Sequence, residues 1–270
     1  MGNLENGKLP LWQESRDTET RTAASPESSF CFHCHSGLDC FNRCCREATI
    51  ILSPYDILRL SRSLDLPTGE FLRRHTRRET EPISNLPLAL VKLARTGGCP
   101  FLGEAGCTVY GDRPAACRLF PLTQGSKLTA EGVKDLLFLR RLDYCQGFTG
   151  DQEWTVASWQ ADQGFADFDR PRRAWLQILL KQAQPGRPPL DDRILSQFYM
   201  VAYDLDAFRT FVFESAFLPA HGLTLEEAQP LGTDDLALLS FGAAYLEHLL
   251  FPAEAPPLSE ALKPVLAESS

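Results

Sequence analysis

Apolar and polar positions divide the chain into three stretches. Residues 1–29 are polar, rich in turn formers and without periodicity, so we expect them to be disordered and outside the fold. Residues 30–150 contain short apolar runs separated by turn residues, whereas residues 151–270 contain long runs at helical spacing. The pattern predicts a mainly helical α+β protein, with a cysteine-rich region that has a few short strands and a C-terminal helical region packed on it.

Local signals place several elements in the middle stretch. Residues 49–52 predict a strand, and a helix follows because Ser53 is a good N-cap and Pro54 suits the first turn. A second helix is expected to begin at Thr68. Apolar runs predict strands at 88–91 and 107–110, and a helix after Pro114 carries Cys117. Residues 136–142 fit a strand or a helix, and we favour the strand.

The third stretch predicts helices at 155–167, 171–184, 194–217 and 233–251. A turn-forming run at 184–189 separates the second from the third. Carboxylates on or near these helices, among them Asp191, Asp204 and Asp206, are expected to serve as caps and surface groups rather than as metal ligands.

The composition of the chain argues against nucleic-acid and membrane partners. The chain has 270 residues, 44% of them apolar, which is enough for a substantial core. Its net charge of −8 provides no basic field to attract a polynucleotide. No apolar run approaches the roughly 20 residues that a membrane-spanning helix needs. We therefore expect neither a nucleic-acid nor a membrane partner.

The cysteines carry the strongest chemical signal. Five of the nine lie between Cys31 and Cys45, in a segment that also contains His33 and His35. A disulfide framework needs an oxidising compartment, and residues 1–30 lack the apolar core of an export signal, so we expect the reducing cytoplasm. Adjacent cysteines are also poorly placed to pair, because neighbouring Cα atoms are about 3.8 Å apart and disulfides favour roughly 4.4–6.8 Å. Ligation of a metal or an iron–sulfur cluster is favoured.

The spacing of the cysteines is compatible with zinc and with an iron–sulfur cluster. Cys31 and Cys34 form one C-x2-C pair, but the second such pair of a zinc ribbon is missing. An iron–sulfur cluster accepts thiolates from distant segments, and nearby cations help to set its potential. Four neighbouring arginines could supply that charge: Arg43, Arg46, Arg113 and Arg118. We favour a [4Fe–4S] cluster over zinc, with the two histidines as less favoured ligands.

Two motifs resemble those of a known family. They are C-F-N-R-C-C-R followed by I-L-S-P-Y-D-I-L-R-L-S-R, and the longer block C-P-F-L-G-E-A-G-C-T-V-Y-G-D-R-P-A-A-C-R-L-F-P-L. Residues 30–150 are thereby identified as resembling the bacterial YkgJ-type cysteine-cluster family, which is described as zinc- or iron-chelating. The first block departs from the family's usual C-x2-C-x2-C-C, so the resemblance does not decide which of Cys31 and Cys34 is the equivalent ligand.

The resemblance implies a metal or iron–sulfur site but no reaction. The ligands it implies are Cys34, Cys40, Cys44, Cys45, Cys99, Cys107, Cys117 and Cys145. One branch of the family includes the flagellin lysine N-methylase, which implies an alternative: a methyltransferase that uses S-adenosylmethionine on a protein substrate. The chain shows neither G-x-G-x-x-G after a strand nor C-x3-C-x2-C, so no motif supports that cofactor. A third alternative is a regulator whose Cys44 and Cys45 respond to oxidants.

Overall fold

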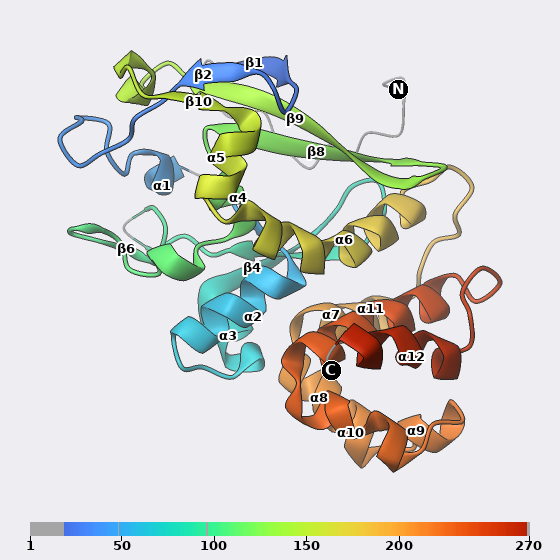
Figure 1. The fold of residues 1–270 in the computed structure, drawn as a ribbon. Helices are drawn as coiled ribbons and strands as arrows, with labels where there is room; N and C mark the ends of the chain where they lie inside the picture. The colour runs from blue at the N-terminus through green and yellow to red at the C-terminus, as the bar shows by residue number, and fades with distance from the viewer. Residues whose placement is uncertain (1–18, 48, 96, 269–270) are drawn as a thin grey trace.

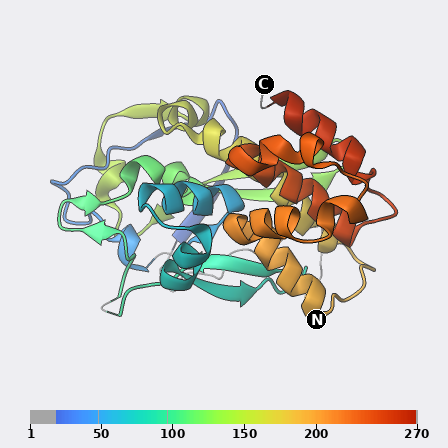
Figure 2. The same cartoon turned by 90° about the horizontal axis from the view of Figure 1, so that it is seen from below.

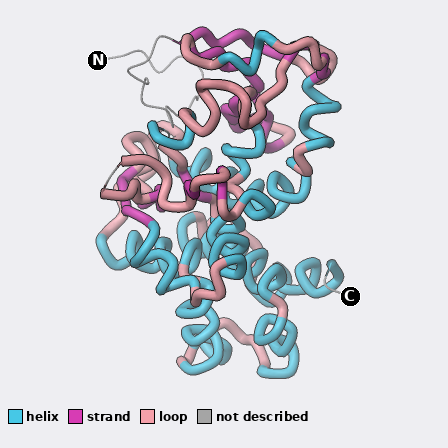
Figure 3. The backbone as a smooth tube through the Cα atoms, turned by 90° about the vertical axis from the view of Figure 1, so that its left-hand side faces the viewer, coloured by secondary structure: helices cyan, strands magenta, loops and turns pink. Residues whose placement is uncertain are grey.

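A computed structural model describes residues 19–47, 49–95 and 97–268 of the chain. Within these residues, twelve α-helices are combined with short antiparallel strands, which confirms the predicted mainly helical α+β fold. Most strands lie at one end of the molecule, and the C-terminal helices form the other end (Figure 1, Figure 3).

The elements up to residue 155 are mostly short. They are β1 (Glu19–Ala24), β2 (Ser29–Cys31), α1 (Cys44–Glu47), β3 (Ile51–Leu52), α2 (Pro54–Ser63), α3 (Thr68–His75), β4 (Thr76–Thr80), β5 (Pro87–Val91), β6 (Leu102–Gly103), β7 (Gly106–Cys107), the 3-10 turn η1 (Tyr110–Asp112), α4 (Ala115–Leu119), β8 (Leu122–Thr129), β9 (Gly132–Leu142), the 3-10 turn η2 (Gln146–Thr149) and β10 (Glu153–Thr155). The later elements are all helices: α5 (Val156–Asp162), α6 (Phe165–Gln182), α7 (Asp192–Tyr203), α8 (Leu205–Glu214), α9 (Phe217–Ala220), α10 (Leu225–Thr233), α11 (Asp235–Leu250) and α12 (Leu258–Glu268).

The strands form four antiparallel sheets, ordered β1-β9-β8, β10-β2, β3-β5-β4 and β6-β7. The predicted strand at 136–142 is the second half of β9. Strand β1 belongs to the segment predicted to be disordered, yet it pairs with β9 along Glu19–Ala24. Strand β9 is more than 100 residues further along the chain, so the local sequence of β1 does not predict the pairing. Residues 1–18 of the same prediction lie outside the described residues.

The helix starts at Ser53 and Thr68 are as predicted. The Ser53 hydroxyl accepts the Asp56 N–H at 3.1 Å, and the Asp56 carboxylate accepts the Ser53 N–H at 2.8 Å, which is a complete capping box. Thr68 donates its N–H to the Asp206 carboxylate at 2.7 Å, and its hydroxyl accepts the Asp206 N–H at 3.1 Å. This reciprocal pair joins the first turns of α3 and α8, so it ties the cysteine-bearing part to the C-terminal helices.

Two predicted elements are interrupted. Of the strand expected at 107–110, only Cys107 lies in β7, because the chain turns into η1, where Asp112 accepts a hydrogen bond from Arg59 of α2 at 2.8 Å. The helix expected over 194–217 breaks at Asp204, whose carboxylate accepts the Ala207 N–H at 3.2 Å and starts α8. Its apolar periodicity continues across the break because α7 and α8 face one core.

The other helices beyond residue 150 follow the sequence pattern with shifted ends. The boundary between α5 and α6 is Gly164, with a φ of 58°, and Pro171 lies inside α6. Helix α11 is capped by Asp234, one residue after the expected Thr233. The pattern did not predict α10 or α12.

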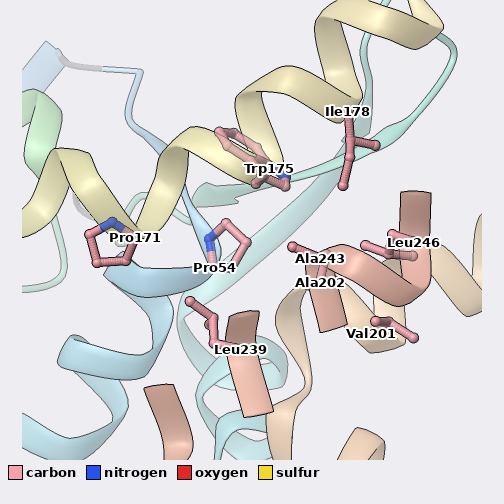
Figure 4. A pocket seen from close by; sticks show the side chains of 9 residues that line it. All are labelled: Pro54, Pro171, Trp175, Ile178, Val201, Ala202, Leu239, Ala243 and Leu246. Carbon is pink, nitrogen blue, oxygen red and sulfur yellow. The ribbon is translucent and has the colours of Figure 1, made fainter. Parts of the chain in front are cut away.

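The C-terminal helices pack directly beside α2 and α3 (Figure 2). Where α2, α6, α7 and α11 meet, a small cavity of about 10 Å³ remains, which is room for at most one water molecule (Figure 4). Its lining is apolar: Pro54, Pro171, Trp175, Ile178, Val201, Ala202, Leu239, Ala243 and Leu246. In the described part of the chain, no helix combines the length and the apolar character needed to cross a membrane.

Candidate metal centre

The eight predicted thiols come from separate segments that meet around α1. Cys44 and Cys45 open this helix. In Figure 1, α1 lies between the loop that carries η2 and the hairpin of β6 and β7. The other six thiols lie on the chain around it: Cys34 and Cys40 before α1, Cys99 before β6, Cys107 in β7, Cys117 in α4 and Cys145 before η2.

Main-chain hydrogen bonds fasten these segments to one another. Cys99 donates its N–H to the carbonyl of Cys45 at 2.8 Å, which holds the start of the hairpin against α1. Gln146 donates its N–H to the sulfur of Cys40 at 3.2 Å. His33 donates its N–H to the carbonyl of Gly147 at 2.8 Å. Segments far apart in sequence are thereby held at one end of the molecule.

Three thiols accept a hydrogen bond from the backbone two residues further on. Phe101 donates its N–H to Cys99, Val109 to Cys107 and Gly147 to Cys145. Burial raises the pKa of all three thiols, and each of these bonds offsets part of that rise because an N–H donor stabilises the thiolate. A donor at the sulfur also fixes the direction of its lone pairs. Both effects suit a thiol that coordinates a metal.

Burial and mutual repulsion act in the opposite direction. The pKa of Cys34 is raised to about 11, mainly by burial and then by Cys145, Cys40 and Cys45. The pKa of Cys117 is raised well above its ordinary value by burial and by Cys45, Cys99 and Cys107. Neighbouring thiolates repel one another, so these thiols stay protonated until a cation binds among them.

The vicinal pair behaves differently. The thiols of Cys44 and Cys45 are hydrogen-bonded to each other. This bond lowers the pKa of Cys45 to about 7 and raises that of Cys44, because Cys44 donates to the Cys45 thiolate. Cys45 is therefore the member of the pair that ionises first.

Arginines beside the thiols are held in place by aromatic rings. Arg113 lies over the ring of Tyr110 at 3.9 Å, and its charge lowers the pKa of Cys107. Arg141 lies over the ring of Phe148 at 4.1 Å, and its charge lowers the pKa of Cys145. Arg141 was not among the predicted arginines. The signal for it was its place at the end of a predicted strand, four residues before a cysteine.

The other predicted arginines have different surroundings. Arg43 lies over the ring of Tyr144 at 4.1 Å. The guanidinium of Arg118 donates to the carbonyl oxygens of Arg113, at 3.1 Å, and Gln163, at 2.9 Å. Arg118 therefore ties α4, which carries Cys117, to the chain before it and to the C-terminal end of α5.

A buried carboxylate, also missed from the sequence, positions α4. Asp56 is 2% exposed and accepts hydrogen bonds from Ser53 at one oxygen and from the Ala115 N–H, at 2.8 Å, at the other. It thus caps both α2 and α4. Burial raises the pKa of Asp56, and its charge raises the pKa of Cys117. Its place three residues after the predicted N-cap Ser53 was visible in the sequence, but its contact with α4 was not.

The remaining candidates lie at the surface. Cys31, His33 and His35 are exposed, and the two imidazole rings are 4.8 Å apart. Among the described residues, no three Cys, His, Asp or Glu side chains converge tightly enough, as they are oriented here, to hold a metal ion. The thiols are gathered and oriented by their donors, and rotation about their side-chain torsions is needed to direct them at one ion.

A comparison with known protein families finds a match over the same region of the chain. Residues 33–146 match the model of the CxxCxxCC family, described as "Putative zinc- or iron-chelating domain". The matched segment contains the eight thiols from Cys34 to Cys145 and leaves out Cys31. No curated protein and no solved structure matches the chain.

Proposed function

Since residues 33–146 are a domain of the CxxCxxCC family, we propose that this metal-chelating protein holds a [4Fe–4S] cluster through its clustered thiolates and does so in the cytoplasm. The observation that carries the proposal is the set of backbone N–H donors at Cys40, Cys99, Cys107 and Cys145. Hydrogen bonds to the ligating sulfurs are one of the main means by which a protein tunes an iron–sulfur cluster.

The charges around the thiols support the same proposal. Four thiolates on a [4Fe–4S]²⁺ core leave a net charge of about −2. The charges of Arg113 and Arg141 offset part of the rise that burial causes in the pKa values of Cys107 and Cys145, so they would also offset part of the charge of the cluster. When bound, the cluster would supply electron transfer or Lewis-acid chemistry, and the chain's own part is to ligate it, to donate hydrogen bonds to its sulfurs and to balance its charge.

Zinc is the competing occupant of these thiols. One zinc ion in a closed tetrahedral site and one [4Fe–4S] cluster each take four thiolates, so the number of thiols does not choose between them. The thiols also arrive from five separate parts of the chain, around α1, β6, β7, α4 and η2. Ligands drawn from distant segments are what an iron–sulfur cluster accepts.

The experiment is metal and sulfide analysis of protein purified without oxygen, together with its visible spectrum. Brown protein with a broad band near about 400 nm, containing iron and acid-labile sulfide, is the expected result. The double variant Cys44→Ser, Cys45→Ser should lose this band, and the exposed Cys31→Ser is the matched control that should keep it. Colourless protein with stoichiometric zinc that unfolds on chelation would overturn the cluster in favour of a structural zinc site.

One observation favours a second candidate, an oxidant-responsive regulator. The hydrogen bond from Cys44 lowers the pKa of Cys45 to about 7, so Cys45 ionises more readily than Cys44 and is the more reactive thiol of the pair. Thiol titration of the metal-free protein before and after mild oxidation tests this. A reversible loss of thiols that Cys45→Ser abolishes supports the regulator, and an unchanged titre argues against it.

A further inference from the structure

Strand β4 forms one edge of the sheet β3-β5-β4. Among the described strands it pairs with β5 alone, so its other side has no neighbouring strand there. Its residues Arg77, Arg78, Glu79 and Thr80 are exposed, and only Thr76 is buried. An edge strand presents main-chain N–H and C=O groups with which a further strand can pair. Strand β4 is therefore a surface to which an extended segment can be added.

The register of β4 against β5 determines which of its main-chain groups point outward. Lys92 donates its N–H to the His75 carbonyl at 2.8 Å, so these two opposed residues form a hydrogen-bonded pair. In an antiparallel ladder such pairs alternate with pairs that share no hydrogen bond. Counting from His75, Arg78 and Thr80 fall at the positions of the second kind, and Arg78 lies opposite Ala89. Their N–H and C=O groups therefore point away from β5.

Arginines are concentrated along this edge. They are Arg73 and Arg74, at the end of α3, and Arg77 and Arg78, in β4. The first two share one carboxylate, that of Glu70, and the third pairs with Glu79. The side chains of these three arginines are 70%, 56% and 43% exposed. Two carboxylates for four guanidinium groups leave the edge positively charged, in a chain whose net charge is −8.

The two arginines of β4 lie on opposite faces of the sheet, because successive side chains of a strand alternate. Arg78 lies over the ring of Tyr199, in α7, at 4.8 Å. A guanidinium that stacks on a ring keeps its in-plane N–H donors for a carboxylate, which it binds with two parallel hydrogen bonds. Arg77 is on the other face, so a strand added to β4 would meet a cation on both of its own faces.

We propose that β4 binds an extended, acidic segment of a partner protein as an additional strand of the sheet. The main chain of the segment pairs with the outward groups of Arg78 and Thr80, and its carboxylates pair with the arginines. A polynucleotide offers phosphate acceptors but no regular row of N–H donors for the carbonyls of β4. A second copy of this chain, paired through β4, would place arginines opposite arginines, which is destabilising.

The test is the binding of a short fluorescein-labelled peptide, in which glutamate and valine alternate, to the full chain, followed by fluorescence anisotropy. The wild type should bind it more tightly than the peptide in which lysine replaces glutamate, and added salt should weaken the binding. The glutamate peptide N-methylated at every main-chain nitrogen keeps the charge but has no N–H to donate, so its affinity should be lower by about tenfold or more. Equal binding of either comparison peptide overturns the proposal.

Two variants separate strand pairing from charge. Thr80→Pro removes an N–H that points away from β5, so it should keep the sheet and weaken binding of the glutamate peptide by about 2- to 10-fold, the value of one hydrogen bond. Arg78→Ala should weaken binding as well and should reduce its dependence on salt. Lys134→Ala removes an exposed cation from the hairpin of β8 and β9, so it is the matched control and should change neither. Circular dichroism checks that each variant is folded.

Three results overturn the assignment. Unchanged affinity in folded Thr80→Pro and Arg78→Ala means that the peptide binds elsewhere. No binding of the glutamate peptide by the wild type at millimolar concentration removes the acidic partner. A dimer that Thr80→Pro dissociates makes a second copy the occupant of the edge. If Thr80→Pro does not fold, Arg78→Ala and the N-methylated peptide decide. None of these results depends on the thiols, so the proposed function is tested separately.

Discussion

Asp56 offers a test of how the fold supports the thiols. Its carboxylate accepts the N–H and hydroxyl of Ser53, at 2.8 and 2.7 Å, and the N–H of Ala115, at 2.8 Å. Replacing Asp56 by Ala removes all three acceptor contacts and leaves two buried N–H groups unsatisfied. At about 1–3 kcal/mol for each of the two orphaned groups, the expected loss is about 2–6 kcal/mol. That is a large part of the roughly 5–15 kcal/mol that stabilises a domain.

Asp56→Asn is the milder and more informative change. The amide keeps one carbonyl oxygen for Ser53 or for Ala115 but presents an NH₂ group to the other, so one of the two caps is lost. We expect the free energy of unfolding to fall by about 1–3 kcal/mol, which lowers Tm by several degrees in a chain of this size. Because Ala115 opens the helix that carries Cys117, the variant should also lose bound iron to a chelator faster.

Urea unfolding of the metal-free protein, followed by far-ultraviolet circular dichroism, measures the first effect. The rate at which the visible band fades in chelator measures the second. Asp151→Asn, at an exposed position, is the matched control and should change neither. If Asp56→Asn stays within about 0.5 kcal/mol of the wild type, the carboxylate does not hold the two helix starts together and the reasoning is wrong.

Three further outcomes follow from other contacts. Thr68→Ala should lower the free energy of unfolding by about 1–2 kcal/mol, because it removes a cap shared with Asp206, while Thr68→Ser should restore most of it; urea melts of both compare them. Burial and His248 lower the pKa of His221, so protonation opposes folding; stability should fall as pH drops below about 7, and His221→Gln should flatten that slope. Metal affinity should rise with pH, since binding displaces protons from thiols whose pKa is raised, and an unbuffered titration with Zn²⁺ should release acid.

Helix starts were predictable from the sequence because their signals are local. Ser53, Pro54 and Asp56 lie within one turn of each other, and the bonds that make them a cap form inside the same segment. Thr68 was predicted as a helix start for the same reason, but its hydrogen-bonding partner was not predicted. The carboxylate that accepts its N–H is Asp206, which the sequence suggested only as a cap or surface group. The fold supplies that long-range partner.

Features that depend on partners far apart in sequence were missed. Strand β1 is stabilised by the edge of β9, and nothing in residues 19–24 alone distinguishes them from the polar stretch before them. The break at Asp204 was hidden because both helices bury the same apolar face. Local periodicity reports which face is buried, but it does not report where one helix ends when the next continues along the same core.

The thiols are also brought together by contacts between segments far apart in sequence. The sequence therefore predicts that metal is bound, but it does not predict which thiols share an ion. Clustering of nine cysteines, five of them before residue 46, is enough to favour metal chemistry, because that inference needs only residue types and density. Assigning thiols to a centre needs their neighbours in space. Cys44 and Cys45 are adjacent in sequence and their thiols are hydrogen-bonded to each other, and both interact with Cys34 and Cys117, whereas Cys99 and Cys107 interact with Cys45. Which thiols share an ion therefore does not follow from their spacing along the chain, because the neighbours of each thiol come from segments that only the fold brings together.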